Sequence, residues 1–539
     1  GENVLEAGGY LGFGRGADSP DRGRRLHDPG YFAQMLKPHS VGTVPVQHCV
    51  IDPAFLMRFL DVHVPAGVGF DYLSAWLGAF AQRERRRVIY SPFFSARLYG
   101  SSGSAPQAIE ISGFRRANRE MFFTQTLLPL QMGLSAKTAY QPTPEITRKK
   151  ELADTEAQLD PADECRADAM ARRIRWPPIE DGPTVGVATC VYGGSPVELF
   201  RKTAASVTRA LRGGDEWIVL LNGPVSGELA AVVEQVSSRR GVRVIVSAKN
   251  LGIIDGLSRC LHASVCDLFA VVDGDDLLEP DALQVISAAA RETGADFLFT
   301  DEGILKGDEI LRLLRRGPFD PVLALENSYI WHLCAFDRRK ALALGAYSDN
   351  GSEFCQDWDV VMRFARSGAQ ISHVPHVLYH WRTHEASQSN AEKQNEGSVL
   401  STRNVLEQLR TSLDLGDHYQ VAPFPRDRGA FEWYLRRLPE ALPTLAALIR
   451  RKEGARGISE AERSLGASSG YLKRIASAAP RTGEWESLLQ ELMAEAEFVV
   501  VLDEDTAVCG QEWLFEAVKY LEIFPDAAMV GGRILDARD

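Results

Sequence analysis

Four consecutive residues, Asp273-Gly274-Asp275-Asp276, directly follow the apolar run LFAVV and are the first candidates for chemistry in this sequence. Several carboxylates at one strand end repel one another unless a cation or hydrogen-bond donors neutralise them. A hard divalent ion accepts carboxylate oxygens and can bridge them to phosphate groups. An acidic turn that caps the following helix would have the same composition, so this string alone leaves both interpretations open.

A second group of candidates lies further along the chain. Asp357 stands in the acidic and aromatic string EFCQDWD, and the later segment HVPHVLYHWRTH brings His380, Arg382 and His384 close together. Histidine can bind a metal ion, and arginine holds a diphosphate through its forked set of donors. Combined with the upstream carboxylates, these residues favour a site that handles phosphate groups.

The elements that must position these residues follow from the alternation of strand and helix patterns over residues 184–300. The segments PTVGVATCVYGG, DEWIVLLNG, VRVIVSAKN and LFAVVDGDD are typical of strands, and helical spacing separates them. This order predicts right-handed parallel crossovers and an open, mostly parallel α/β sheet with flanking helices. Ligands bind beyond the carboxyl ends of such strands. The small polar residues found there are Thr189, Asn222, Asn250 and Asp273.

Composition bounds the class of protein. The 539 residues include 60 Lys and Arg against 72 Asp and Glu, a net charge of −12, with 45% hydrophobic residues. These are globular values, the length suggests about three domains, and the acidic balance argues against nucleic acid as a partner. We find no apolar run of membrane-spanning length and no signal-peptide pattern. The eight cysteines are scattered without a CxxC pair, which favours free thiols in a reducing cytoplasm.

The chain also repeats itself in an unusual order. The segment LFAVVDGDDLLEPDAL is echoed by EFVVVLDEDTAVCGQEWL near the C-terminus, and WHLCAFDRRKALALGAY is echoed near the N-terminus by residues 47–73. We therefore hypothesise that residues 441–539 and 1–100 complete one second α/β domain. Residues 184–390 would form the first domain, 101–183 a helical connector and 391–440 a linker. Between Leu442 and Glu497 no clear second strand is evident.

These segments together resemble a known family. Residues 184–390, through DGDD, TDEGIL, QDWDVVMR and HVPHVLYHWRTH, resemble a family 2 glycosyltransferase with the GT-A fold. The resemblance is to the tandem-domain enzymes that build bacterial O-antigens, rhamnans and capsules. The two ends of the chain resemble the second domain of those enzymes, which implies two GT-A-like domains.

The resemblance implies metal-dependent, inverting transfer of a sugar, with Mn²⁺ or Mg²⁺ as the metal. It implies Asp357 as the general base, Asp275 and His380 as metal ligands, and Asp273 at the nucleotide and its ribose. The remaining expected nucleotide-sugar contacts are Thr189, Asn222, Asn250, Trp358, Arg382 and His384. In the second domain the corresponding candidates are Asp503, Asp505 and Asp71.

The same resemblance implies a UDP- or dTDP-sugar as donor and a glycan or lipid-linked glycan as acceptor. The enzyme would then work in the cytoplasm at the inner face of the membrane, as a peripheral protein or within a complex. Two alternatives stay open at this point. One is a non-catalytic glycan-binding scaffold made of degenerate transferase domains. The other is a sugar nucleotidyltransferase, although the TCVYGGSP segment lacks the basic residue that a triphosphate would need.

Overall fold

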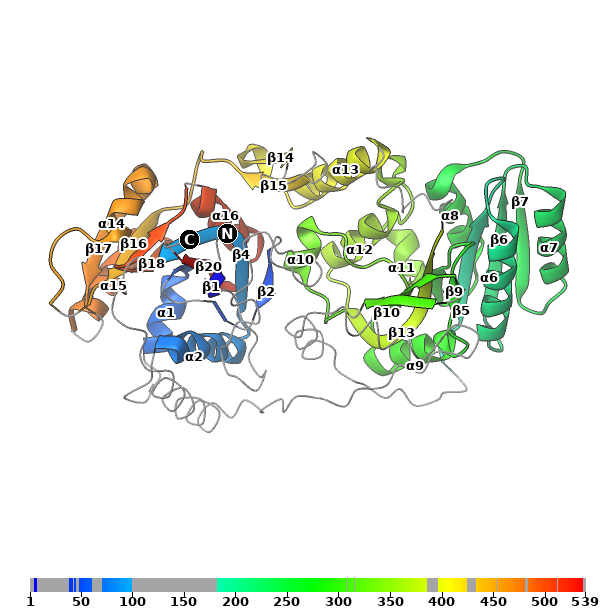
Figure 1. Ribbon diagram of the computed structural model, residues 1–539, viewed down its shortest axis with the longest axis horizontal. Coiled ribbons are helices and arrows are strands. Elements are labelled where there is room, and N and C mark those ends of the chain that lie inside the picture. The colour runs from blue at the N-terminus through cyan, green and yellow to red at the C-terminus, as the bar shows by residue number, and fades with distance from the viewer. Residues whose placement is uncertain are drawn as a thin grey trace.

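The computed structural model describes residues 4–6, 38–60, 70–98, 182–384, 396–423, 433–479 and 483–536, apart from 42, 45–47, 308, 315, 453 and 511 (Figure 1). Within these ranges the strands form two nine-stranded sheets and one two-stranded sheet. Nearly all of the expected connector over 101–183 lies outside the described residues.

The first sheet has the strand order β7-β6-β5-β8-β12-β10-β13-β9, with β11 beside β10. Its strands are β5 (Val185–Val191), β6 (Glu216–Asn222), β7 (Val242–Ser247), β8 (Leu268–Val271), β9 (Leu277–Leu278), β10 (Phe297–Lys306), β11 (Glu309–Leu314), β12 (Cys334–Asp337) and β13 (Ile371–Thr383). The neighbours β7, β6, β5 and β8 are parallel, as the alternation of strands and helices predicts. The fold is thus mixed α/β.

Helices cover both faces of this sheet because its strands are apolar on both sides. These helices are α6 (Val197–Ala210), α7 (Gly227–Ser237), α8 (Gly252–Ala263), α9 (Ala282–Thr293), α10 (Pro321–Glu326), α11 (Arg338–Ala343) and α12 (Gln356–Arg366). Along β6, Trp217 and Val219 join the core cluster that contains residues of α6 and α7. The alternate residues Ile218 and Leu220 join the cluster that contains residues of α8. This period of two is what a strand buried on both faces requires.

The second sheet combines the two ends of the chain, in the order β17-β16-β18-β3-β20-β4-β19, with β1 on β20 and β2 on β4. Its strands are β1 (Val4–Glu6), β2 (His39–Val41), β3 (His48–Ile51), β4 (Arg87–Leu98), β16 (Leu445–Arg450), β17 (Leu472–Ala478), β18 (Phe498–Asp503), β19 (Thr506–Val508) and β20 (Ala527–Asp536). Its helices are α1 (Pro53–Leu60), α2 (Phe70–Arg83), α14 (Glu460–Leu465), α15 (Gly483–Glu495) and α16 (Glu512–Ile523).

The two sheets share one topology. Reading β16 to β20 and then β3 and β4 reproduces the order and pairing directions of β5, β6, β8, β9, β10, β12 and β13. The small strand β1 pairs antiparallel with β20, as β11 pairs with β10. In the described residues, the second sheet lacks a strand in the place of β7. The second sheet begins with strands of the C-terminal segment and is completed by strands of the N-terminal segment. The repeated sequence segments therefore appear in the order of the first sheet only when residue 539 is read into residue 1.

The strand that the sequence does not reveal between Leu442 and Glu497 is β17. It lies at the edge of the second sheet and pairs in parallel with β16. Its sequence LKRIASA places the charged residues Lys473 and Arg474 within the strand, and its burial alternates. An edge strand keeps charged side chains in solvent, so it lacks the continuous apolar run of a central strand.

The sheets are joined by shared core and by polar contacts. One cluster of buried residues includes Val50 and Trp513 of the second sheet's lobe as well as Ile218 of the first. Strand β2 reaches the first lobe at Ser40, whose backbone N and Oγ donate to the Asp320 carboxylate at 2.7 and 2.8 Å. The segment expected as a linker contains helix α13 (Glu396–Ser412) and the hairpin β14 (Tyr419–Pro423)–β15 (Trp433–Arg437). Figure 1 shows α13 above α12 of the first lobe, with the hairpin next to it on the side of the second lobe.

None of the helices in the described part of the chain combines the length and the apolar character that crossing a bilayer would require.

Candidate active site

A cavity of about 580 Å³ lies at the carboxyl ends of the parallel strands of the first sheet. Residues from the ends of β5, β6 and β8, the start of α8 and α12, and the end of β13 line it. This is where an open α/β sheet binds its ligands. Six residues singled out from the sequence line this cavity: Asn222, Asn250, Asp273, Asp275, Asp357 and His384.

The acidic turn after β8 presents two carboxylates and buries a third. The Asp273 side chain is 54% exposed, whereas Asp276 is buried. Asp276 accepts hydrogen bonds from the Tyr379 hydroxyl at 2.6 Å and from the Arg382 backbone N at 2.7 Å. Burial raises the pKa of Asp276 well above its ordinary value. Asp276 therefore shapes the turn, and Asp273 and Asp275 face the cavity.

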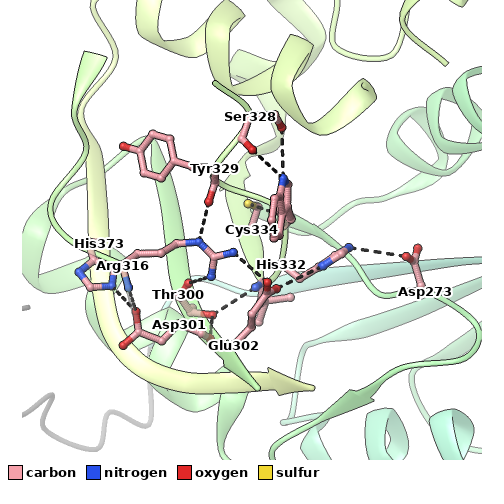
Figure 2. A network of polar contacts seen from close by, with 12 residues as sticks. Asp273, Thr300, Asp301, Glu302, Arg316, Ser328, Tyr329, His332, Cys334 and His373 are labelled. Carbon is pink, nitrogen blue, oxygen red and sulfur yellow. Dashed lines mark hydrogen bonds and ion pairs between the residues drawn. The ribbon is translucent and has the colours of Figure 1, made fainter. Parts of the chain in front are cut away.

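His332, which the sequence does not single out, faces the same turn. Its Nε2 lies 3.6 Å from Asp273 Oδ2, and its Nδ1 lies 3.3 Å from Glu302 Oε2 (Figure 2). The imidazole also stacks on Tyr379 with ring centroids 4.6 Å apart. Burial alone would lower the pKa of His332, but the Asp273 and Glu302 carboxylates raise it well above its ordinary value.

Behind His332 lies a fully buried ion pair between Glu302 on β10 and Arg316. Arg316 Nη2 is 2.9 Å from Glu302 Oε1, and both side chains have an exposed fraction of 0%. The same guanidinium donates to the backbone oxygens of Tyr329 and Thr300 (Figure 2). Asp273, His332, Glu302 and Arg316 thus form one chain of alternating charge from the cavity into the core. Glu302 lies in the quoted segment TDEGIL and His332 in WHLCAFD, so both could have been noticed in the sequence. Their contacts with Arg316 and Asp273 could not, because no local pattern links these residues.

Asp357 is the second residue of α12 and lines the cavity. Burial raises the pKa of Asp357 to about 7, although the nearby His332 opposes the shift. A carboxylate with a pKa near neutral is suited to accept and release a proton. Next to it, Trp358 is buried and its Nε1 donates to the Ala324 carbonyl of α10 at 2.7 Å. Trp358 therefore anchors the start of α12 and does not itself line the cavity.

Three other expected residues also have structural contacts. Thr189 is buried, and its Oγ1 accepts from Trp217 Nε1 at 3.0 Å. His380 is buried with its Nε2 2.7 Å from Glu279 Oε1. None of the three residues Thr189, His380 and Arg382 is among those that line the cavity.

Arg382 is buried as well, and its guanidinium holds the acidic turn in place. Its Nε donates to the Asp275 carbonyl, and its Nη2 donates to the Leu199 carbonyl at 2.8 Å and to Thr203 Oγ1 at 2.9 Å. The contacts of Arg382 therefore favour a role in positioning the turn.

Two asparagines that line the cavity hold the backbone at the start of α8 through hydrogen bonds. Asn222 Oδ1 accepts from the Leu251 backbone N at 2.8 Å, and its Nδ2 donates to the Gly252 carbonyl at 3.0 Å. Asn250 Oδ1 accepts from the Gly252 backbone N at 2.9 Å. Asn250 is exposed, so its side chain borders the open cavity. Glu353 joins them by accepting from the Ile253 backbone N at 3.1 Å.

The donor atoms at this site suit a hard divalent cation. Asp273, Asp276 and His332 offer ligand atoms within 4.8 Å of one another. His384 Nε2 lies 2.8 Å from Asp275 Oδ2, so a second imidazole accompanies a second carboxylate of the same turn. Carboxylate oxygens with one or two imidazoles fit Mn²⁺ well and Mg²⁺ through their oxygens.

In the second sheet, Asp503 ends β18 and pairs with Arg450, while Asp505 Oδ2 lies 2.8 Å from Lys452 Nζ. Asp71 lies in α2, but its side chain is outside the described residues.

A strand-end cavity in an α/β sheet, lined by an acidic turn and a half-buried carboxylate at a helix N-terminus, defines a class of ligand-binding enzyme domain. Comparison with known proteins gives the family. Residues 187–308 match the family model described as Glycosyl transferase family 2. The chain therefore contains a domain of glycosyl transferase family 2.

Three curated relatives are distant. An uncharacterised protein, y4gI, of Sinorhizobium fredii is 26% identical over 248 residues, which is 45% of this chain and 26% of that protein. The O-antigen biosynthesis protein RfbC of Myxococcus xanthus is 24% identical over 295 residues, 53% of this chain and 22% of that protein. The amylovoran biosynthesis glycosyltransferase AmsE of Erwinia amylovora is 23% identical over 203 residues, 36% of this chain and 73% of that protein. The chain thus spans about a quarter of the length of the first two.

Among solved structures, S. aureus TarS (residues 1–349) in complex with UDP-GlcNAc matches at 14% identity and a TM-score of 0.36, over 43% of this chain and 67% of that one. GalNAc-T7 with UDP, GalNAc and Mn²⁺ matches at 13% identity and a TM-score of 0.35, over 42% of this chain and 48% of that one. At these scores we draw nothing about ligands from the likeness.

Proposed function

We propose that the first sheet carries a metal-dependent, inverting glycosyltransferase. It would transfer a sugar from a UDP- or dTDP-sugar to a hydroxyl of a bacterial surface polysaccharide or a related glycan, free or lipid-linked. The observation that carries the proposal is that Asp357 and the turn Asp273–Asp275 line one cavity. A proton acceptor and an anion-neutralising metal site in one cavity are what such a transfer needs.

In this reaction the acceptor oxygen forms a bond to the anomeric carbon while the bond from that carbon to the diphosphate oxygen breaks. Asp357 takes the proton that the acceptor hydroxyl loses, and the sugar inverts because attack and departure occur on opposite faces. Mn²⁺ or Mg²⁺, when bound, would neutralise the charge that develops on the departing diphosphate. The residues that would hold it are Asp273 and Asp275 with His332 or His384, whose ring nitrogens already face these carboxylates.

Electrostatics divide the roles between the carboxylates. Asp273 and Asp275 line the cavity, and their oxygens lie beside the His332 and His384 imidazoles, where a metal ion can share both kinds of ligand. Burial raises the pKa of Asp357 to about 7, so its carboxylate is basic enough to accept a proton and can still release it near neutral pH. The three carboxylates of one site thus acquire two different roles from their surroundings.

The proposal extends to the domain plan. The GT-A fold is assigned to the first sheet, over residues 184–390, and a GT-A-like domain to the second, over residues 441–539 and 1–100. Support comes from their common strand order and pairing directions. Residues 101–183 and 391–440 would connect them. The acceptor class suggests that the protein works at the inner face of the membrane, as a peripheral component.

The direct test is release of nucleoside diphosphate from a panel of UDP- and dTDP-sugars. With Mn²⁺ present at least one donor should be hydrolysed slowly in water and faster with a glycan acceptor. Chelation with EDTA should reduce the rate to background, and added Mn²⁺ should restore it. Donor binding that does not depend on the metal, without turnover, would instead support a non-catalytic scaffold. Release of pyrophosphate from a nucleoside triphosphate and a sugar phosphate would support a nucleotidyltransferase.

The pH profile gives a second test. Below its pKa of about 7, Asp357 already carries a proton and cannot accept another. We therefore expect kcat/KM to fall about tenfold for each pH unit below about 7 and to level off above it. The donor dissociation constant, measured by calorimetry over the same range, serves as the control and should change less. A flat kcat/KM between pH 5 and pH 8 would contradict the assignment of the base.

A further inference from the structure

The acidic string of the second sheet, Asp503-Glu504-Asp505, corresponds in position to Asp273-Gly274-Asp275 of the first. Both follow the third of the neighbouring parallel strands, β18 and β8. Strand β16 begins opposite β18 with Leu445 beside Phe498, and β5 begins opposite β8 with Val185 beside Leu268. The registers of the two sheets can therefore be compared residue by residue at this end.

That comparison exposes a difference in charge. Arg450 pairs in register with Asp503, and Arg451 and Lys452 follow it. In the first sheet the same three positions are Cys190, Val191 and Tyr192, none of which is basic. The second strand end thus carries three cations where the first has none.

Each cation of the second sheet contacts one carboxylate of the acidic string. Arg450 Nη2 pairs with Asp503 Oδ1, Arg451 Nε lies 3.0 Å from Glu504 Oε2, and Lys452 Nζ lies 2.8 Å from Asp505 Oδ2. The Arg450 pair is mostly buried, with exposed fractions of 9% and 18%. Each carboxylate of the string therefore has a cationic partner at the end of β16, and Arg451 also pairs with Glu462 at 3.0 Å.

The register supplies a further basic residue. In the first sheet His380 pairs with Leu277, four residues after Asp273. In the second sheet Arg97 pairs with Ala507, four residues after Asp503. Arg97 thus occupies the register position of His380, which adds a further permanently charged side chain near the second strand end.

We propose that the second sheet neutralises its acidic strand end with its own Arg450, Arg451 and Lys452 and does not bind a divalent cation. Together with the metal site of the proposed function, on which the count rests, this gives one such ion for the chain, at the first sheet. A metal ion entering the second site would have to break these ion pairs and face the displaced cations. In the described residues, the one group of three histidine, cysteine or acidic side chains close enough to share an ion belongs to the first sheet.

This inference predicts the stoichiometry of Mn²⁺. Titration of the full chain with Mn²⁺ alone, followed by the loss of the free-ion EPR signal, should give one bound equivalent. The matched variants are Asp275→Asn and Asp505→Asn, which remove the same charge from corresponding positions. Asp275→Asn should weaken Mn²⁺ binding at least about tenfold, the effect of about 1.4 kcal/mol. Asp505→Asn should leave the dissociation constant within about twofold, because its partner is Lys452.

Two bound equivalents in the unaltered chain, or loss of one in Asp505→Asn, would overturn the inference. A count of zero would agree with it but contradict the metal site proposed for the first sheet, so the two proposals fail separately. The Asp505 side chain is 22% exposed and its Lys452 partner 68% exposed, so the variant should fold. Circular dichroism with thermal melting confirms that before titration.

Discussion

Asp357→Asn should abolish sugar transfer while donor binding stays nearly unchanged. The amide keeps the size of the carboxylate and its place at the start of α12, but it cannot take the proton of the acceptor hydroxyl. Loss of a positioned base typically lowers the rate by about 10²–10⁴-fold. The measurement is kcat for nucleoside diphosphate release with acceptor, beside the donor dissociation constant from calorimetry with Mn²⁺.

The control is Asp359→Asn, two residues further along the same helix. The Asp359 carboxylate pairs with Arg363 at 2.7 Å and does not belong to the cavity lining. Its replacement removes one ion pair and should leave kcat within a few-fold. Turnover by Asp357→Asn at the level of the control would refute the role of Asp357 as base.

Arg316→Met should lower the free energy of unfolding by about 3–5 kcal/mol. Glu302 is fully buried, and without Arg316 its charge would lack the cation that the structure places 2.9 Å away. His332 can compensate only in part, since it also faces Asp273. Denaturant unfolding followed by circular dichroism measures the loss.

Two further variants test whether the loss of stability comes from an uncompensated buried charge. The double variant Arg316→Met, Glu302→Gln should lose less than Arg316→Met alone, because no uncompensated charge stays in the core. Arg436→Met breaks the exposed pair with Glu512 and should cost only about 0–1 kcal/mol. Equal losses of unfolding free energy in Arg316→Met and Arg436→Met would show that the buried ion pair stabilises the fold no more than an exposed one.

Much of the site follows from strand periodicity alone. The turn after LFAVV and the asparagines after two other strands were predicted at one sheet edge, and four of those residues line the cavity: Asn222, Asn250, Asp273 and Asp275. Strand ends are predictable because apolar runs stop where a parallel sheet meets solvent. The α/β fold of residues 184–390 was predicted for the same reason.

Other features depend on contacts between distant segments, which a single sequence does not contain. Arg316 reaches Glu302 only because β10 and β11 form a hairpin whose register places them together. The partner of His380 is Glu279, which comes from the far side of the acidic turn. Edge strand β17 was missed because its alternating charged residues do not form an apolar run.

The contact between Ser40 and Asp320 has a mechanical consequence for any attempt to divide the chain. Asp320 also accepts from the Val322 backbone N at the start of α10, and the Ala324 carbonyl of that helix holds Trp358 beside Asp357. A fragment limited to residues 184–390 would lose the two donors of Ser40 and would open the common apolar cluster to water. Excising the lobe would therefore weaken the contacts that position Asp357, and separating the roles of the two lobes calls for point substitutions within the intact polypeptide.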